Sequence, residues 1–182
     1  GGIAMMRVLS MLLILARLLA PQMASFRLFA GMQSGYLLRC HVVAQDDTAE
    51  MQRVKLCVRD AVLYAYAAHG TPGAMLPQAR ALLPVLTRAA EDAAEAEGFS
   101  GKVRVCLERR AFEEYMLEGV TVPAGNYPAL MVYLGNAQGH NWWGLLDPDM
   151  ACRCAGGEGI SSPWDWSWQE FLDALRRIFS VE

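Results

Sequence analysis

The sequence predicts an α+β fold: a small mixed or antiparallel sheet with two main helices packed on one face, plus an amphipathic helix at the C-terminus. Two observations predict it. A strand-like segment is followed by two long segments with helical spacing of apolar residues, and strand patterns then continue to residue 146. This order is typical of helices that pack on one side of a sheet.

The first strand is expected at 36–44, where branched and aromatic residues are concentrated. Leu38 and Val42 alternate with Arg39 and His41. Because successive side chains of a strand point to opposite faces, the apolar pair and the polar pair are expected on different sides of the sheet.

Two helices are expected next. Segment 45–70 has apolar residues at helical spacing, and Asp47 followed by Glu50 has the spacing of a capping box. The second helix is expected from 76 to 97, with a kink or break at Pro84, because proline removes a helical hydrogen bond.

Three further strands are expected, at 102–108, 127–134 and 141–146. Segment 127–134 is apolar on both faces, which places it centrally in the sheet. Val120 and Thr121 are expected only to lead into a turn.

Two adjacent tryptophans, Trp142 and Trp143, lie in the last expected strand. They cannot fill the same pocket, because neighbours on a strand face opposite ways. One tryptophan is expected in the core, and the outward one needs a cover, either a helix of this chain or a partner. We expect Trp143 and His140 to belong to a partner surface, since exposed tryptophan is enriched at interface hot spots. The alternative is that Trp143 fills the core.

The first 35 residues contain no acidic residue, and Arg7 precedes an apolar run over 8–16. A basic start followed by a short apolar stretch is typical of a secretory signal. The run is too short for a comfortable transmembrane helix. Ala24 and Ala30 are candidate ends of the signal, and an amphipathic N-terminal helix is the alternative.

Three parts are therefore expected: a signal-like or membrane-anchoring segment at 1–35, a domain at 36–151, and a Gly/Ser-rich loop with an amphipathic helix at 152–182. Ser162 and Asp165 provide the start of that helix. Its tryptophan-rich stripe is interpreted as a docked helix, with binding at a membrane surface as the alternative.

Charge argues against a nucleic-acid partner. The chain has 16 basic and 19 acidic side chains. Three of the basic ones lie in the first 35 residues, so residues 36–182 contain 13 basic and 19 acidic side chains. A domain with a net negative charge lacks the excess of basic residues that nucleic-acid binding needs. The five cysteines include no Cys-x-x-Cys pair, and no ligand spacing indicates a metal site.

One polar cluster is expected where the first strand meets the first helix, formed by Arg39, His41, Asp47, Arg59 and Asp60. It is either a hydrogen-bonded scaffold or a recognition site.

A catalytic interpretation would use Cys57 as nucleophile with His41 and His140 as bases, in an extracytoplasmic hydrolase acting on cell-wall peptides. Cys57 belongs to an apolar helical stripe, however, and buried thiols are usually inert. We therefore expect no catalytic residues.

Two blocks resemble the stage II sporulation protein R family of endospore-forming bacteria: RCHVVAQDDTAEMQRVKLCVRDAV at 39–62 and PAGNYPALMVYLGNAQGHNWWGLLDPD at 123–149. The matching residues are Arg39, His41, Asp47, Gln52, Lys55, Val58, Arg59, Asp60, Pro123, Ala124, Gly125, Tyr127, Gly135, Gly139, Asn141, Trp142 and Trp143. The similarity extends over about 36–150. Gly144 departs from it, because a cysteine usually follows the tryptophans in that family.

The resemblance implies a signalling protein, not an enzyme, with no cofactor or metal. Such proteins are exported from the forespore into the space between the forespore and mother-cell membranes. There they activate a membrane-embedded aspartic protease, which leads to maturation of the early mother-cell sigma factor from pro-sigma-E. The expected partner-binding residues are Arg39, His41, Asp47, Arg59, Asp60, His140, Asn141, Trp142 and Trp143. A membrane-associated adaptor held through residues 1–35 is a further alternative.

Overall fold

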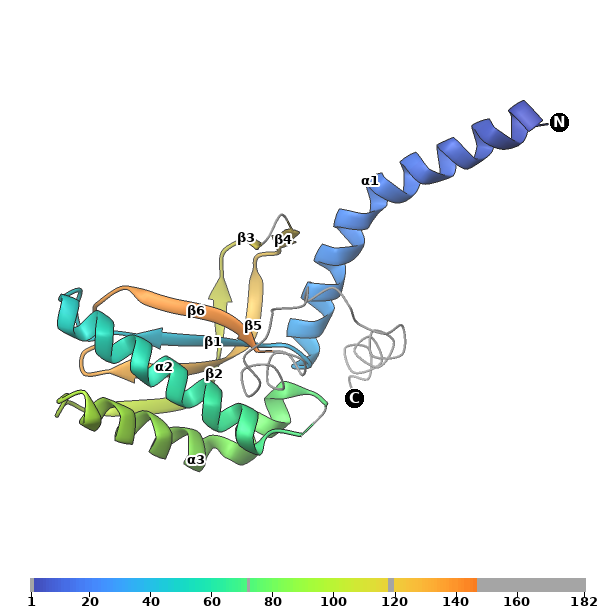
Figure 1. The fold of residues 1–182 in the computed structure, drawn as a ribbon. Coiled ribbons are helices and arrows are strands. Elements are labelled where there is room, and N and C mark those ends of the chain that lie inside the picture. Colours follow the sequence, from blue (N-terminus) through green and yellow to red (C-terminus); the bar gives the residue numbers. More distant parts are fainter. Residues whose placement is uncertain (1, 72, 118–119, 147–182) are drawn as a thin grey trace.

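The computed structural model describes residues 2–71, 73–117 and 120–146 (Figure 1). The helix expected at 152–182 lies outside these residues. The helices are α1 (Gly2–Ser34), α2 (Ala49–His69) and α3 (Met75–Ala96). The strands are β1 (Leu38–Val43), β2 (Val103–Phe112), β3 (Tyr115–Leu117), β4 (Val120–Val122), β5 (Gly125–Leu134) and β6 (Asn141–Leu146). Mixed helix and sheet in this order confirm the α+β prediction.

Four strands form one sheet in the order β2-β5-β1-β6. β1 runs parallel to β5 and antiparallel to β6, and β2 runs antiparallel to β5, so the sheet is mixed. β5 lies inside the sheet, as its two apolar faces predict. Both α2 and α3 lie on one face of this sheet, while the N-terminal part of α1 projects away from the domain (Figure 1).

Three local predictions need correction. β2 continues to Phe112 beyond the expected end at residue 108, and β3 and β4 form a separate antiparallel ribbon where only a turn was expected. Helix α2 is capped by Thr48, whose side chain accepts a hydrogen bond from the Met51 amide at 3.3 Å. Asp47 is not the cap, because its carboxylate is bonded to the turn before β6.

The main core lies between the sheet and the pair α2 and α3. Its inward strand residues include Leu38 and Val42 of β1, which pack with Val58 and Val62 of α2. These side chains are fully buried. The alternation predicted for the first strand is therefore confirmed on its apolar side.

A second core cluster joins the end of α1 to the opposite face of the sheet. Leu28 and Met32 of α1 pack with Tyr127 of β5 and Leu145 of β6. Leu28 and Met32 are each 1% exposed, so the last turns of α1 are part of the folded domain. Nearer its start, α1 is exposed through Met23, apart from the residues whose side chains are not described.

The apolar run that looked too short for a membrane span belongs to a longer helix. Residues 5–34 form 30 helical residues with a mean hydropathy of 1.6, long and apolar enough to cross a membrane by length and composition alone. A signal sequence near an N-terminus meets the same criterion.

The role of α1 in the domain gives the first prediction. Leu28→Ala should lower the free energy of unfolding by about 2–5 kcal/mol, because it leaves a cavity in the second core. Leu12→Ala is the matched control, since Leu12 lies on the same helix and is 54% exposed. Urea unfolding of the full chain in mild detergent measures both. Equal stability of the two variants would mean that the end of α1 does not support the domain.

Candidate functional site

The two tryptophans lie on opposite faces of the sheet, as predicted. Trp142 packs against the main core, and Trp143 lies on the face turned away from α2 and α3, which we call the outer face. On the outer face Trp143 is paired in register with His41 of β1. Its ring and that of Tyr115 of the β3–β4 ribbon are nearly perpendicular, with ring centres 4.7 Å apart.

Arg39 also points to the outer face, where aromatic rings enclose it. Its guanidinium carbon lies 4.1 Å from the centre of the Phe112 ring and 4.8 Å from that of Trp143. The side chain is only 4% exposed, and burial lowers the pKa of Arg39. The rings provide cation–π contacts with its faces. Within the described part of the chain, its Nε and Nη1 atoms are buried and have no hydrogen-bond partner.

His41 stacks on the other side of this cluster. Its ring lies 4.9 Å from Phe112, and its Nδ1 atom is 2.7 Å from the amide nitrogen of Asn141. Burial lowers the pKa of His41 to about 4, and the nearby positive charge of Arg39 acts in the same direction. The ring is therefore neutral at pH 7. With Asn141 donating to Nδ1, the proton lies on Nε2, which is buried and unpartnered among the described residues.

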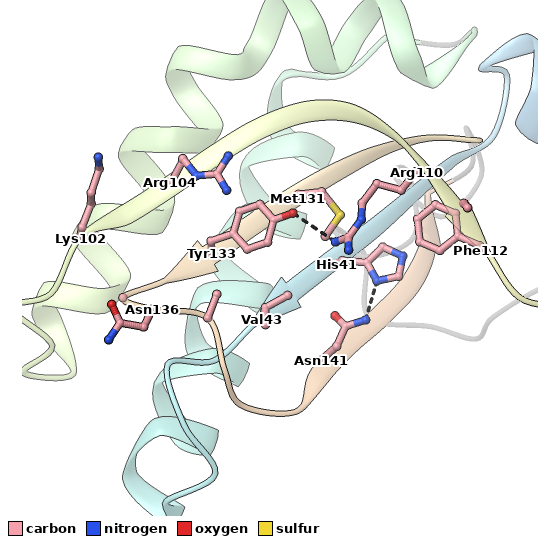
Figure 2. Close-up of a pocket in the computed structure, with 13 residues that line it drawn as sticks. His41, Val43, Lys102, Arg104, Arg110, Phe112, Met131, Tyr133, Asn136 and Asn141 are labelled. Atoms are coloured by element: carbon pink, nitrogen blue, oxygen red, sulfur yellow. Dashed lines mark hydrogen bonds between the residues drawn. The ribbon is translucent and has the colours of Figure 1, made fainter. Parts of the chain in front are cut away.

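A groove of about 780 Å³ opens beside His41 on the outer face (Figure 2). We call it the outer groove. Its lining residues come mainly from β1, β2, β5 and the turn before β6: His41, Val43, Lys102, Arg104, Arg110, Ala111, Phe112, Met131, Tyr133, Gly135, Asn136, Ala137 and Asn141.

Strand β2 gives the outer groove its charge. The guanidinium of Arg104 lies 4.1 Å from the centre of the Tyr133 ring, and Arg110 donates to the Tyr133 hydroxyl at 3.2 Å. That hydroxyl donates in turn to Glu108, whose carboxylate is 3.8 Å from Arg110. Lys102 is exposed at the end of the groove. The groove thus combines aromatic surface with three cationic side chains.

Asp47 and His140 meet at a different place, the junction of β1, α2 and the turn before β6. The carboxylate of Asp47 accepts a hydrogen bond from the His140 amide at 2.6 Å and lies 2.6 Å from its ring Nδ1. These bonds lower the pKa of Asp47. Lys55, only 6% exposed, donates to the His140 carbonyl at 3.1 Å and also to Gln52. The group holds the turn against the start of α2, and the ring of His140 remains exposed.

Arg59 and Asp60 lie apart from both groups, on α2. They form an ion pair at 2.7 Å, and the Arg59 guanidinium carbon is 5.3 Å from the centre of the Trp142 ring. The prediction of one polar cluster is therefore wrong. Arg39 and His41 point away from α2, because the alternate residues of β1 face that helix.

Several site residues were missed by the sequence interpretation. Phe112, Tyr115, Arg110 and Tyr133 complete the outer face, and all but Tyr133 lie beyond the expected end of the second strand. The continued alternation in VRVCLERRAF, with Arg104, Arg110 and Phe112 on one face, is the signal that could have revealed them.

Cys57 has no arrangement for nucleophilic catalysis with His41. It lies on α2, across the sheet from His41, and burial together with a hydrogen bond to the Glu97 carboxylate raises the pKa of its thiol. A raised pKa disfavours the reactive thiolate. Among the described residues, no group of three or more His, Cys, Asp or Glu side chains could hold a metal ion.

The fold and the site define an α+β domain whose candidate site has the composition of a binding surface: aromatic rings, cations, and donors that find no acceptor in the described part of the chain lie around a groove. Comparison with known proteins makes this specific. The chain belongs to the stage II sporulation protein R family, which matches residues 34–155.

One relative is stage II sporulation protein R of Bacillus subtilis (strain 168), which is 28% identical over 133 residues. The match covers 70% of this chain and 59% of the relative, so the chain spans about three fifths of that protein. No solved structure matches this chain. The family assignment confirms the resemblance drawn from the two sequence blocks and is consistent with sporulation signalling.

The buried histidine gives the second prediction. An unfolded chain protonates His41 near pH 6.5, and the folded chain does so only near pH 4. Between these values the unfolded state binds more protons, so the free energy of unfolding should fall as pH is lowered. The loss should reach about 3 kcal/mol, since one pKa unit corresponds to about 1.4 kcal/mol.

Urea unfolding between pH 7 and pH 4 should therefore show a steeper loss for the natural chain than for His41→Gln. His69→Gln, at the end of α2, is the control and should keep the natural slope. Identical slopes for the natural chain and His41→Gln would show that His41 is not buried as described.

Proposed function

We propose that this chain is an exported sporulation signalling protein that acts by binding. It docks onto a membrane-embedded aspartic protease of the mother cell and activates it, which leads to maturation of the early mother-cell sigma factor from pro-sigma-E. Membership of the stage II sporulation protein R family is the observation that carries this proposal. The chain acts in the space between the forespore and mother-cell membranes.

Helix α1 supports the export step. Its exposed apolar part would serve as a signal or as an anchor, and its last turns pack in the second core of the domain. A protein anchored this way acts on a partner that comes within reach of the membrane surface.

The outer face supports the docking step. Trp143 is half-buried, Tyr115 beside it on the ribbon is 48% exposed, and Met116, the next residue of the ribbon, is 59% exposed. Aromatic and methionine side chains are enriched in protein interfaces, and tryptophan is the most frequent hot-spot residue. We assign the protease contact to this face, with Arg39, His41 and Asn141 behind it. Asp47 and His140, with Arg59, Asp60 and Trp142, shape the neighbouring surfaces.

Co-production with the protease and pro-sigma-E tests the proposal. The natural chain should cause maturation of the precursor. Trp143→Ala should reduce it by about tenfold or more, because a hot-spot truncation costs about 2 kcal/mol or more of binding. Tyr64→Ala on α2 is the control, since Tyr64 is 66% exposed on another surface. Maturation that is independent of the natural chain would refute the proposal.

A second variant distinguishes loss of docking from loss of folding in Trp143→Ala. Tyr115→Ala removes an exposed side chain that contacts Trp143 and leaves both core clusters intact. It should also reduce maturation. Normal maturation with Tyr115→Ala and with a folded Trp143→Ala would remove this face from the docking site.

The second candidate is an extracytoplasmic hydrolase acting on cell-wall peptides, and a Cys57→Ser variant separates it from the first. A signalling protein should retain full maturation activity with this change, since docking needs no thiol and the raised pKa of Cys57 disfavours the reactive thiolate. Turnover of cell-wall peptides by the purified chain, lost in Cys57→Ser, would support the hydrolase instead.

A further inference from the structure

The outer groove has a charge opposite to that of the whole chain. The chain carries a net charge of −3, whereas the outer face near the groove carries Arg39, Lys102, Arg104 and Arg110 against the carboxylate of Glu108. Glu108 is already bonded to Tyr133. Because surfaces that bind each other have complementary potentials, a groove of this kind favours an acidic partner.

The unpartnered atoms next to the groove are all hydrogen-bond donors. Arg39 contributes its Nε and Nη1 atoms and His41 its Nε2 atom, and the described residues offer none of them an acceptor. Buried donors are nearly always paired in folded proteins, so three donors in one place indicate a missing acceptor. Neutral His41 and charged Arg39 together suit a carboxylate, which accepts several hydrogen bonds at once.

The aromatic contacts of Arg39 do not prevent its guanidinium from binding a carboxylate. Rings of Phe112 and Trp143 lie against the guanidinium, and a guanidinium in such contacts still donates from its edge. The donor atoms are buried, but the His41 side chain lines the groove, so a carboxylate approaches them from the groove. Exposed Arg110 and Lys102 lie in the groove where an incoming acidic segment makes its first contacts.

We infer that the outer groove binds an acidic, extended segment of the protein partner, with one carboxylate of that segment received by Arg39 and His41. This inference rests on the proposed function, and it requires that the protease present an acidic segment to this chain.

An oligoglutamate peptide with a fluorescent label tests the site directly. The full chain in neutral detergent should bind it, as measured by fluorescence anisotropy, and high salt should weaken binding. An oligolysine peptide and a Gly-Ser peptide should not bind. Absence of oligoglutamate binding, or equal binding of all three peptides, would overturn the inference.

Reversing the charge of single groove residues tests whether oligoglutamate binds in the outer groove. Arg110→Glu and Lys102→Glu should each weaken oligoglutamate binding by about tenfold. Among the described residues the Lys102 side chain makes no hydrogen bond, and the bond from the Gly135 amide to the Lys102 carbonyl does not depend on that side chain. The Lys102 variant therefore keeps the test valid if Arg110→Glu fails to fold. Arg88→Glu on α3 is the matched control, with a side chain that is 75% exposed, and should bind normally. Unchanged binding in the two groove variants would overturn the site.

A membrane is the other acidic surface within reach of this chain. Vesicles containing anionic lipid should not compete with oligoglutamate for the groove. Displacement of oligoglutamate by anionic vesicles, and not by vesicles of neutral lipid, would assign the groove to lipid and overturn the inference.

The co-production assay separates this inference from the proposed function. If the natural chain causes maturation and both groove variants cause it equally well, the acidic-segment inference fails and the signalling function stands. If the natural chain causes no maturation, the proposed function fails, whatever the peptide binding.

Discussion

Strand β1 lies between β5 and β6, and this position constrains the whole molecule. Because β1 has a strand on each side, its outward side chains Arg39 and His41 lie in the middle of the outer face, and both are buried there. The inward residues join the core under α2 and α3, and the outward pair must be covered by other elements. Phe112 and Trp143, from strands at the two edges of the sheet, supply that cover.

Burying this pair is expensive for the fold. Apolar side chains of similar volume would pack at both positions without unpaired donors, and replacing buried charges in this way is often neutral or stabilising. The cation–π contacts and the bond to Asn141 offset part of the cost, and Arg39 Nε and Nη1 and His41 Nε2 remain unpaired among the described residues. A polar pair kept under such conditions is better explained by a partner that completes it than by the stability of the free chain.

The alternation of apolar and polar residues correctly predicted the features that depend on a single segment of the chain. The faces of β1, the separation of Trp142 from Trp143 and the interior place of β5 follow from alternation, and the structure has all three. The pattern failed where distant segments meet: Asp47 has a capping sequence, yet its carboxylate is taken by His140, 93 residues away. Likewise the contact of Arg39 with Phe112 depends on the register of β2 against β5, which no single segment specifies.

The same sheet face joins the N-terminal helix to the groove. A row of rings runs across it, from Trp143 through His41, Phe112 and Tyr127 to Phe29 of α1, with neighbouring centres 4.9–6.5 Å apart. Leu28, Ala30 and Met32 are buried at the α1 end of this row. Cleavage at Ala30 would remove Leu28 from the second core, whereas cleavage at Ala24 would leave it intact. Any processed form that keeps a stable outer face must therefore retain the last turns of α1.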